Sequence, residues 1–192
     1  MIRIAVFASG SGTNAENLIQ YFANNKEIQI HMIFTNNPKA GVIDRAHKLK
    51  TPCNVFSRSE FDNGDGILKQ LKEDKIDFIV LAGFLLLIPE NIIEKFNGKI
   101  INIHPALLPL HGGKGFYGKN VHQSVIDSGS MISGITIHHV NENFDNGEII
   151  FQAACHVSKN ETAETLAEKI HKLELAWFPV VLEKLILNPE NN

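Results

Sequence analysis

Short apolar runs alternate with amphipathic segments through most of the chain. The run 2–8 ends at a glycine-rich turn, and residues 77–83 (DFIVLAG) are apolar without alternation, as in strands buried on both faces of a parallel sheet. Residues 14–23 place their apolar side chains on one helical face. Further strands are predicted over 28–34, 52–56 and 99–104, and further helices over 41–49, over 59–72 (interrupted or delayed by Gly64 and Gly66), and after Pro89, which suits the first helical position.

The second half of the chain changes this pattern. Residues 133–140 and 148–157 predict two strands separated by a polar loop, which indicates a hairpin-like or mixed edge of the sheet. Residues 162–187 carry an apolar stripe and predict a long final helix before a short polar tail, 188–192. We therefore expect an α/β fold with a Rossmann-like, mostly parallel central sheet, helices on both faces and antiparallel strands toward the C-terminal half.

Composition narrows the class of protein. The chain has 192 residues and a formal net charge of −3, so we expect one domain without the basic surface of a nucleic-acid-binding protein. Cys53 and Cys155 lie far apart, which disfavours a disulfide framework or a zinc site. Since no stretch approaches the ~18 apolar residues of a membrane span, the sequence predicts a cytoplasmic protein with no membrane partner.

Three loops are candidates for ligand binding, because ligands of such sheets bind beyond the carboxyl ends of the strands. They cover residues 9–14, 83–89 and 102–109. The first loop (SGSGTN) joins a strand to a helix, and its glycines let backbone N–H groups approach a small monoester phosphate. It lacks the lysine of a nucleoside-triphosphate loop. A tight turn with a capping box between Thr13 and Glu16 is the alternative, and the two are compatible.

Asn102 and His104 are the candidate catalytic side chains of the third loop. Alternate residues of a strand share a face, so both point the same way at the carboxyl end. A buried structural histidine is the plainer alternative, although two polar groups there are costly without partners. Asp145 lies in an Asp-Asn-Gly turn sequence. If that loop reaches the crevice, Asp145 would hold His104 charged and help to move a proton in acyl transfer, while His104 and Asn102 stabilise the oxyanion.

Other reaction chemistries find less support in the sequence. There is no G-x-S-x-G sequence, and neither cysteine stands at a predicted strand end that faces the crevice. A serine or cysteine nucleophile is therefore not indicated. His138 and His139 are neighbours on a predicted strand and face opposite ways, so they cannot chelate one ion. We expect no metal site.

Five segments that span most of the chain occur in a specific order: ASGSGTN (8–14), VLAGF (80–84), INIHPALLP (101–109), SGITIHHV (133–140) and FDNGEIIFQ (144–152). Together they resemble the phosphoribosylglycinamide formyltransferases, folate-dependent enzymes of purine biosynthesis. The resemblance implies that 10-formyltetrahydrofolate, a co-substrate, gives its formyl group to the amino group of glycinamide ribonucleotide. It also implies one formyltransferase domain over 1–192, with a phosphate- and nucleotide-binding half, 1–100, and a catalytic and folate-binding half, 101–192.

The same resemblance implies roles for individual residues. Asn102, His104 and Asp145 match the catalytic residues, and Glu174 matches a position that contacts the nucleotide substrate, with a solvated helix residue as the alternative. The phosphate of that substrate would bind at Gly12, Thr13 and Asn14. The folate would bind along two segments, Leu86, Leu87 and Ile88 in the first and Val140, Asn141, Glu142, Asn143 and Phe144 in the second.

Two departures from the family pattern affect these roles. Leu86 stands where the family often has arginine, so no cationic side chain contributes there. The segment after Pro109 (LHGGKGFYGKNVH) looks longer and richer in glycine than the common form, and it predicts a mobile flap near the active site. Lys114, Tyr117 and Lys119 either contact anionic ligands or are solvated loop residues.

Related functions remain as alternatives. A methionyl-tRNA formyltransferase would need a C-terminal tRNA-binding domain, and a formyltetrahydrofolate hydrolase carries an extra N-terminal domain; neither is expected in a chain whose first strand begins at residue 2 and which ends at 192. A non-catalytic sensor of phosphate ligands would need the glycine loop but not Asn102, His104 and Asp145. The sequence leaves the choice between monomer and homodimer open.

Overall fold

The computed structural model describes residues 1–188 and contains two compact units. The first unit comprises Met1–Asn102 and Val140–Glu142, and the second comprises Ile103–His139 and the described residues from Asn143 onward. Residues 189–192, which the sequence predicts as part of a polar tail, lie outside the described residues.

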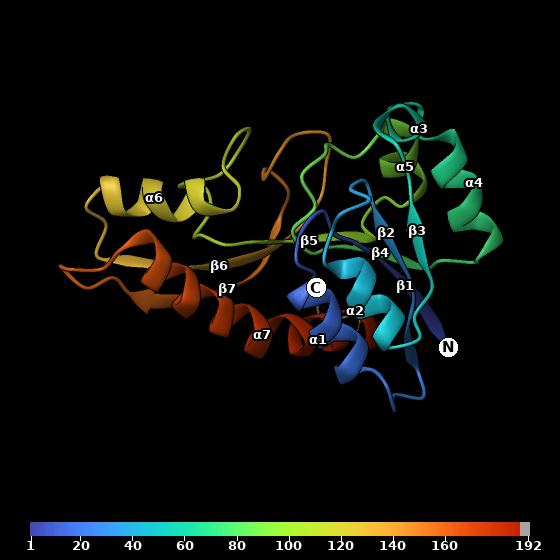
Figure 1. The fold of residues 1–192 in the computed structure, drawn as a ribbon, viewed down its shortest axis with the longest axis horizontal. Helices are drawn as coiled ribbons and strands as arrows, with labels where there is room; N and C mark the ends of the chain where they lie inside the picture. Colours follow the sequence, from blue (N-terminus) through green and yellow to red (C-terminus); the bar gives the residue numbers. More distant parts are fainter. Residues whose placement is uncertain (189–192) are drawn as a thin grey trace. The chain divides into compact units, whose positions relative to one another are not determined.

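The first unit alternates strands and helices, as its apolar runs predict (Figure 1). Neighbouring strands pair in parallel along the order β3-β2-β1-β4-β5. The strands are β1 (Ile2–Phe7), β2 (Ile28–Thr35), β3 (Cys53–Val55), β4 (Phe78–Leu81) and β5 (Ile100–His104), whose last two residues belong to the second unit. The helices are α1 (Thr13–Tyr21), α2 (Val42–Lys48), α3 (Arg58–Asn63), α4 (Asp65–Glu73) and α5 (Glu90–Lys95).

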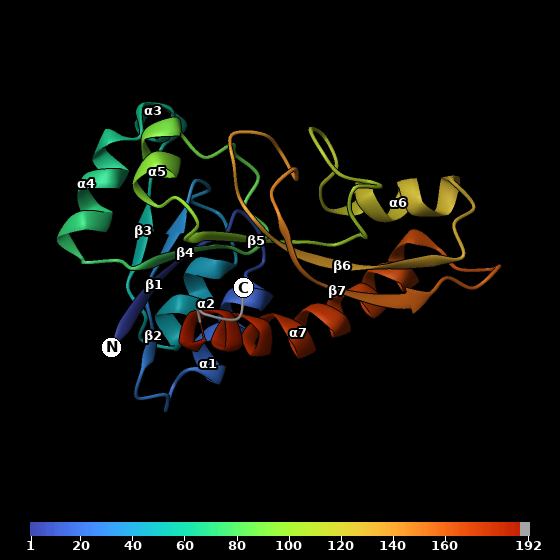
Figure 2. The same cartoon turned by 180° about the vertical axis from the view of Figure 1, so that it is seen from behind.

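The second unit contains α6 (Lys119–Asp127), β6 (Ile132–His139), β7 (Ile149–His156) and α7 (Ala163–Leu187). Strands β6 and β7 pair in the antiparallel sense, as the sequence predicts for this part of the chain. Helix α7 packs against both strands and against α6 (Figure 2). The full strand order, β3-β2-β1-β4-β5-β6-β7, forms one seven-stranded sheet, so the predicted α/β fold class is confirmed.

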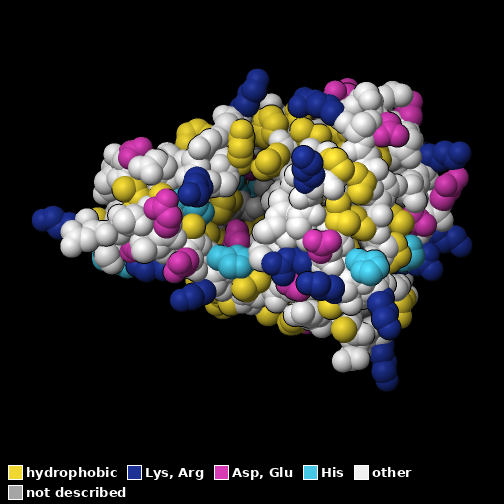
Figure 3. Space-filling model, viewed as in Figure 1, with side chains coloured by type: hydrophobic (Ala, Val, Ile, Leu, Met, Phe, Trp, Pro, Cys, Tyr) yellow, Lys and Arg dark blue, Asp and Glu magenta, His cyan; other side chains and the backbone are white. Residues whose placement is uncertain are grey.

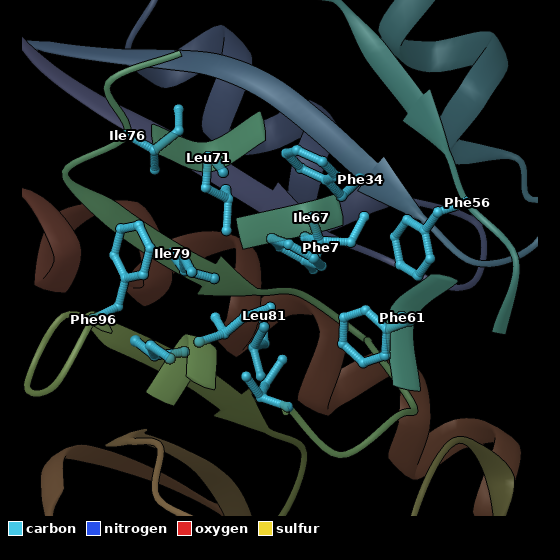
Figure 4. Packing of buried hydrophobic residues seen from close by; sticks show 14 residues of the cluster. Phe7, Phe34, Phe56, Phe61, Ile67, Leu71, Ile76, Ile79, Leu81 and Phe96 are labelled. Atoms are coloured by element: carbon cyan, nitrogen blue, oxygen red, sulfur yellow. The ribbon is translucent and has the colours of Figure 1, made fainter. Parts of the chain in front are cut away.

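Strand alternation divides the apolar side chains of the first unit between two faces. On one face, the rings of Phe7 and Phe34 stack with centroids 4.7 Å apart, and those of Phe56 and Phe61 stack at 5.0 Å (Figure 4). Helices α3, α4 and α5 contribute buried residues to the same cluster and cover this face. The intervening residues of β1 are also fully buried and point toward the opposite face, which α1 and α2 cover.

Two helix boundaries differ from the predictions. The segment 59–72 forms two helices, because Gly64, with φ of 71°, ends α3 and begins α4. This positive φ favours glycine, and a Cβ here would also require Asn91 to shift, since its Oδ1 would lie 2.3 Å away. Gly66 lies inside α4 and does not interrupt it. Pro89 is not the first helical residue; its ψ of 144° is extended, and it serves as the N-cap of α5.

The surface carries charge of both signs. On the face seen in Figure 3, acidic and basic side chains are interspersed, and no large area has a single sign. This distribution agrees with the small net charge of −3. Among residues 1–188, no helix combines the length and the apolar character that crossing a bilayer requires.

Candidate active site

In the second unit, the carboxylate of Asp145 lies between two buried histidines. His104 is the last residue of β5, and its Nδ1 lies 3.5 Å from Oδ2 of Asp145. His138, near the end of β6, places its Nε2 3.7 Å from Oδ1 of the same carboxylate. The backbone N–H of Gly113 donates to Oδ2 at 2.9 Å. Asp145 is therefore more than a turn residue, and the structure brings it to His104 as the sequence predicts.

The backbone of Asp145 explains why this residue type occupies the loop. Its φ of 53° is in the left-handed region, which aspartate tolerates better than most residues. The loop that joins β6 to β7 thus turns sharply at Asp145 and directs the carboxylate inward, where the side chain is only 12% exposed. A turn conformation and a buried carboxylate thus coexist at this position.

The second ring nitrogen of His104 faces an oxygen that can only accept. Nε2 lies 2.8 Å from the backbone carbonyl oxygen of His111, so Nε2 carries the proton of that hydrogen bond. His138 is held in a similar way, because its Nδ1 lies 2.7 Å from the carbonyl oxygen of His139. The orientation of each imidazole relative to Asp145 is therefore determined by a backbone contact on its far side.

The surroundings shift the pKa values of both members of the central pair. Burial lowers the pKa of His104 below its ordinary value, and this effect outweighs the negative charge of Asp145, which raises it. Burial by itself raises the pKa of Asp145, but contacts with His138, His104 and the Gly113 N–H outweigh burial and hold it below its usual range. Burial of the imidazole thus opposes the effect of the Asp145 carboxylate on His104, and whether Asp145 keeps His104 charged during the reaction stays a prediction.

Thr136, on β6, supports the segment that follows His104. Its hydroxyl donates to the carbonyl of Ala106 at 2.7 Å and accepts from the N–H of Leu108 at 2.9 Å. Nε2 of Gln152, on β7, also donates to this hydroxyl at 2.9 Å. These bonds attach the chain after β5 to the antiparallel pair. The sequence offered only a weak signal for this role, one polar residue in the apolar stretch ITIHHV.

Glu174 is not a solvated residue. Its side chain, on α7, is 14% exposed, and Nδ1 of His171 lies 3.2 Å from its Oε2. Its negative charge raises the pKa of His104 and of His122, although burial leaves both below the ordinary value. His122 is 7% exposed in the middle of α6, where it caps no helix end. Glu174 and His122 thus belong to the electrostatic surroundings of His104.

The segment 110–118, called the flap below, follows this group in the chain. Leu110 is 64% exposed and Tyr117 is 50% exposed, as expected for a loop with few apolar contacts. Nζ of Lys119, at the start of α6, lies 3.6 Å from Oε1 of Glu164, and both side chains are largely exposed. The flap nevertheless reaches inward through the His111 carbonyl and the Gly113 N–H described above.

In the first unit, the glycine loop forms the start of α1. Gly12 is the N-cap residue, with φ of 77°, and no side chain caps this helix. The predicted capping box is wrong, because Thr13 is already the first helical residue and Glu16 forms an ion pair with Arg45. The N–H groups at the start of α1 are therefore left to backbone partners or to a ligand, an arrangement suited to an anion.

Arg45 lies on α2 and contacts this loop, and no sequence pattern predicted that contact. From α2, its Nε donates to the carbonyl of Ser11 at 2.9 Å. The N–H of Val42 donates to the carbonyl of Gly10 at 3.2 Å, so two residues of α2 hold the loop from outside. Ser11 and Arg45 are 34 residues apart in the sequence, so no local pattern connects them.

Ser9 connects the glycine loop to the segment after β4. Its buried hydroxyl donates to Oδ1 of Asn36 at 2.7 Å and accepts from the N–H of Leu85 at 3.2 Å. Beyond Leu85, Leu86 packs on the apolar cluster of the first unit together with Val140. The predicted folate segments therefore meet, in part, on one cluster within this unit. Ile88 is buried, whereas Leu87 and Phe144 are 44% and 37% exposed.

Asn102 lies two residues before His104 on β5, so the two side chains leave the strand on the same face. It pairs in register with Leu81 of β4. Within residues 1–188, no group of three or more His, Cys, Asp or Glu side chains is arranged to hold a metal ion.

We expect replacement of Gly12 to destabilise the first unit. In Gly12→Ala, the new Cβ would lie 2.5 Å from Cβ of Val42 at a φ that disfavours any side chain. The free energy of unfolding, measured in urea, should fall by about 2–4 kcal/mol. Gly10→Ala is the matched control, because a Cβ at Gly10 meets nothing within 4 Å. Equal stability of the two variants would contradict the expectation.

Comparisons with known proteins converge on one family. Residues 2–182 match the sequence model of a family described as formyl transferase. The phosphoribosylglycinamide formyltransferase of Bacillus subtilis (strain 168) is 35% identical over 191 residues, which cover 97% of this chain and 95% of that protein.

Solved structures of similar sequence have the same fold. A phosphoribosylglycinamide formyltransferase from Anaplasma phagocytophilum has a TM-score of 0.89 and 33% identity, with 97% of this chain and 87% of that chain covered. The corresponding protein from Bacillus halodurans has a TM-score of 0.88 and 36% identity, with 98% and 97% covered. The similarity therefore extends over both units.

Proposed function

The chain belongs to the formyl transferase family, and we propose that it transfers the formyl group of 10-formyltetrahydrofolate to the amino group of N1-(5-phospho-D-ribosyl)glycinamide. The reaction yields the N-formyl product in purine biosynthesis. The names of the similar proteins from B. subtilis and B. halodurans support this substrate. The observation that carries the proposal is the contact between His104 and Asp145, with Asn102 two residues away on the same strand.

The catalytic roles that we propose agree with the directions of the pKa shifts of His104 and Asp145. The substrate amine attacks the formyl carbon, a C–N bond forms, and the carbonyl oxygen gains negative charge. The amide N–H of Asn102 stabilises that oxygen. Neutral His104 takes the proton that the attacking nitrogen must lose, and ionised Asp145 stabilises the imidazolium that forms. The C–N10 bond of the folate then breaks, and the proton passes to the departing nitrogen.

The remaining residues bind the two substrates. Gly12, Thr13 and Asn14 hold the phosphate through the start of α1, supported by the α2 contacts of the loop. Glu174 accepts hydrogen bonds from the ribonucleotide, and its low exposure agrees with a role inside the site. The folate lies along Leu86, Leu87 and Ile88 and along Val140, Asn141, Glu142, Asn143 and Phe144. No arginine contributes at position 86, so backbone groups recognise the pterin there.

We assign the whole chain, 1–192, to one formyltransferase domain, with residues 1–100 as the phosphate- and nucleotide-binding half and 101–192 as the catalytic and folate-binding half. The protein works in the cytoplasm as a monomer or homodimer. It uses no metal and binds neither nucleic acid nor membrane. The interspersed surface charge in Figure 3 is consistent with small-molecule substrates.

An assay with each substrate omitted in turn tests this function. With both 10-formyltetrahydrofolate and glycinamide ribonucleotide present, tetrahydrofolate and formylated ribonucleotide should appear in equal amounts. Omission of either substrate should stop the reaction. Formate release without the ribonucleotide would identify a formyltetrahydrofolate hydrolase instead. Ribonucleotide binding without any turnover would identify a non-catalytic sensor of phosphate ligands.

A further inference from the structure

Strand β7 leaves one edge of the sheet open. The strand order ends at β7, and among residues 1–188 only β6 pairs with it. The opposite edge strand, β3, is protected by its length of three residues, whereas β7 has eight. The sequence of β7 (IIFQAACH) contains no Lys, Arg, Asp, Glu or Pro, the residues that usually keep an edge strand from pairing with another chain.

Two local features limit the open edge to five residues. At one end, the pairing with β6 skips Ile150, which forms a bulge. At the other end, Nζ of Lys169 donates to the carbonyl of His156 at 3.4 Å and occupies that acceptor. The uninterrupted part of the edge, residues 151–155, is therefore centred on Ala153.

Within this part, the backbone groups of Gln152 and Ala154 point out of the sheet. The N–H of Val157 donates to the carbonyl of Met131, next to β6, at 2.9 Å. Because the direction of hydrogen bonding alternates along an antiparallel pair, Gln152 and Ala154 direct their N–H and C=O groups away from β6. Each carries one donor and one acceptor, so a strand laid along this edge finds a complete set of backbone partners.

Exposed apolar side chains accompany the edge. The ring of Trp177, on α7, packs on that of Phe151 with centroids 5.0 Å apart, yet Trp177 is 41% exposed. Val180, about one helical turn further on, is 43% exposed, and Ile149 of β7 is 45% exposed. An extended peptide would satisfy the backbone of β7 alone. A folded partner with an apolar surface of its own would cover α7 as well.

The charges at the two ends of β7 favour a second copy of the chain. Glu148 precedes the strand, Lys159 follows it, and both residues are exposed. When two identical strands pair in the antiparallel sense, the start of each lies beside the end of the other, so Glu148 of one copy comes close to Lys159 of the partner subunit. Glu161, which also lies near the end of β7, is already paired with Lys169.

We propose that two copies of this chain form a homodimer in which their β7 edges pair antiparallel about Ala153. The backbone of Gln152 in each copy then bonds that of Ala154 in the other. The two-fold axis is perpendicular to the paired strands, so both α7 helices lie on the same face, where Trp177 and Val180 lose their exposure. The dimer does not depend on the proposed function, because none of these residues takes part in the proposed reaction.

Sedimentation velocity of the full chain over a range of concentrations tests the dimer. The wild type should reach twice the chain mass of 21.4 kDa. Val180→Lys, which places a charge in the apolar surface, should raise the dimer dissociation constant about tenfold or more. Val55→Lys is the matched control, because Val55 is an exposed valine on β3, at the opposite edge, and its substitution should leave the constant unchanged.

Ala154→Pro tests the backbone pairing. It removes the outward N–H of one residue, a change that an edge strand tolerates, and it should also raise the dissociation constant about tenfold. Urea unfolding of each variant shows that a change in mass is not a loss of fold. If Ala154→Pro does not fold, the comparison of Val180→Lys with Val55→Lys still decides on the interface.

An exchange of the end charges tests the antiparallel orientation. Glu148→Lys should weaken the dimer, since two lysines then meet, and the double variant Glu148→Lys with Lys159→Glu should restore it. The whole of β7 separates the two positions within one chain, so the recovery cannot arise inside a single copy. A double variant no tighter than Glu148→Lys would refute this orientation. A wild type that stays monomeric at every concentration, or a dimer that Val55→Lys weakens as much as Val180→Lys, would overturn the proposal.

Discussion

His104→Ala should lower the rate of formyl transfer by about 10³-fold or more, while ribonucleotide affinity stays within about tenfold. The side chain of His104 is only 4% exposed, with Asp145 on one side of it and the His111 carbonyl on the other. Its proposed role is in the transition state, where a proton leaves the attacking amine. Single-turnover kinetics and equilibrium binding of the ribonucleotide, measured on the same preparation, separate the two effects.

His156→Ala is the control for this result, because His156 lies on β7 of the same unit and is exposed. Its turnover should equal that of the wild type. Urea unfolding of both variants shows whether a loss of activity is a loss of fold. If His104→Ala turns over at a near-normal rate, the assignment of His104 as the proton-transfer group is wrong.

Asp145→Asn should lower kcat by about 10²-fold or more and should move the acidic limb of the pH profile to lower pH. The amide keeps the shape of the side chain but removes the charge between His104 and His138. That charge raises the pKa of His104 against the effect of burial, so its removal lets the pKa fall further. His104 then stays neutral to a lower pH, so the acidic limb of the kcat profile moves to lower pH. The maximum kcat is smaller at the same time.

The same substitution should change how stability depends on pH. In the folded protein the pKa of Asp145 is below its ordinary value, so the unfolded chain binds a proton more readily as the pH falls. The carboxylate therefore stabilises the fold above the unfolded pKa, and this contribution is lost as the pH falls through the folded value. In Asp145→Asn, the free energy of unfolding in urea should no longer show this decrease at low pH. In Asp127→Asn, an exposed control on α6, the decrease should remain. An unchanged kcat profile in Asp145→Asn would show that Asp145 does not control the titrating pair.

The periodicity of apolar residues was sufficient to predict the α/β fold. Strands β1, β2, β4 and β5 lie within a residue or two of their predicted ranges, because continuous apolar runs can be buried on both faces only in a covered parallel sheet. Alternation also placed Asn102 and His104 on one face of a strand, since the side-chain period of a strand is two. The boundaries that failed, at Pro89 and around Gly64, depend on backbone angles that apolar periodicity does not report.

The candidate site was predicted only in part. Resemblance to a family led to Asp145 and Glu174, whereas local chemistry alone favoured a turn for the first and left a solvated helix residue open for the second. No sequence pattern pointed to Arg45, Thr136 or the bond between His111 and Ser124. Each of these contacts joins residues that are 13 or more positions apart, and each depends on how elements pack.

The sequence by itself determined the alternation of strands and helices in the first unit, the loops at the carboxyl ends of the strands and the residue types that can transfer a proton. The tertiary structure decided that Asp145 lies between two histidines and that burial lowers the pKa of His104. It also decided that a flap carbonyl holds the proton of His104 on Nε2. The physical reason is the same in each case: a pKa and a tautomer depend on burial and on neighbours within a few ångströms, and packing alone supplies both.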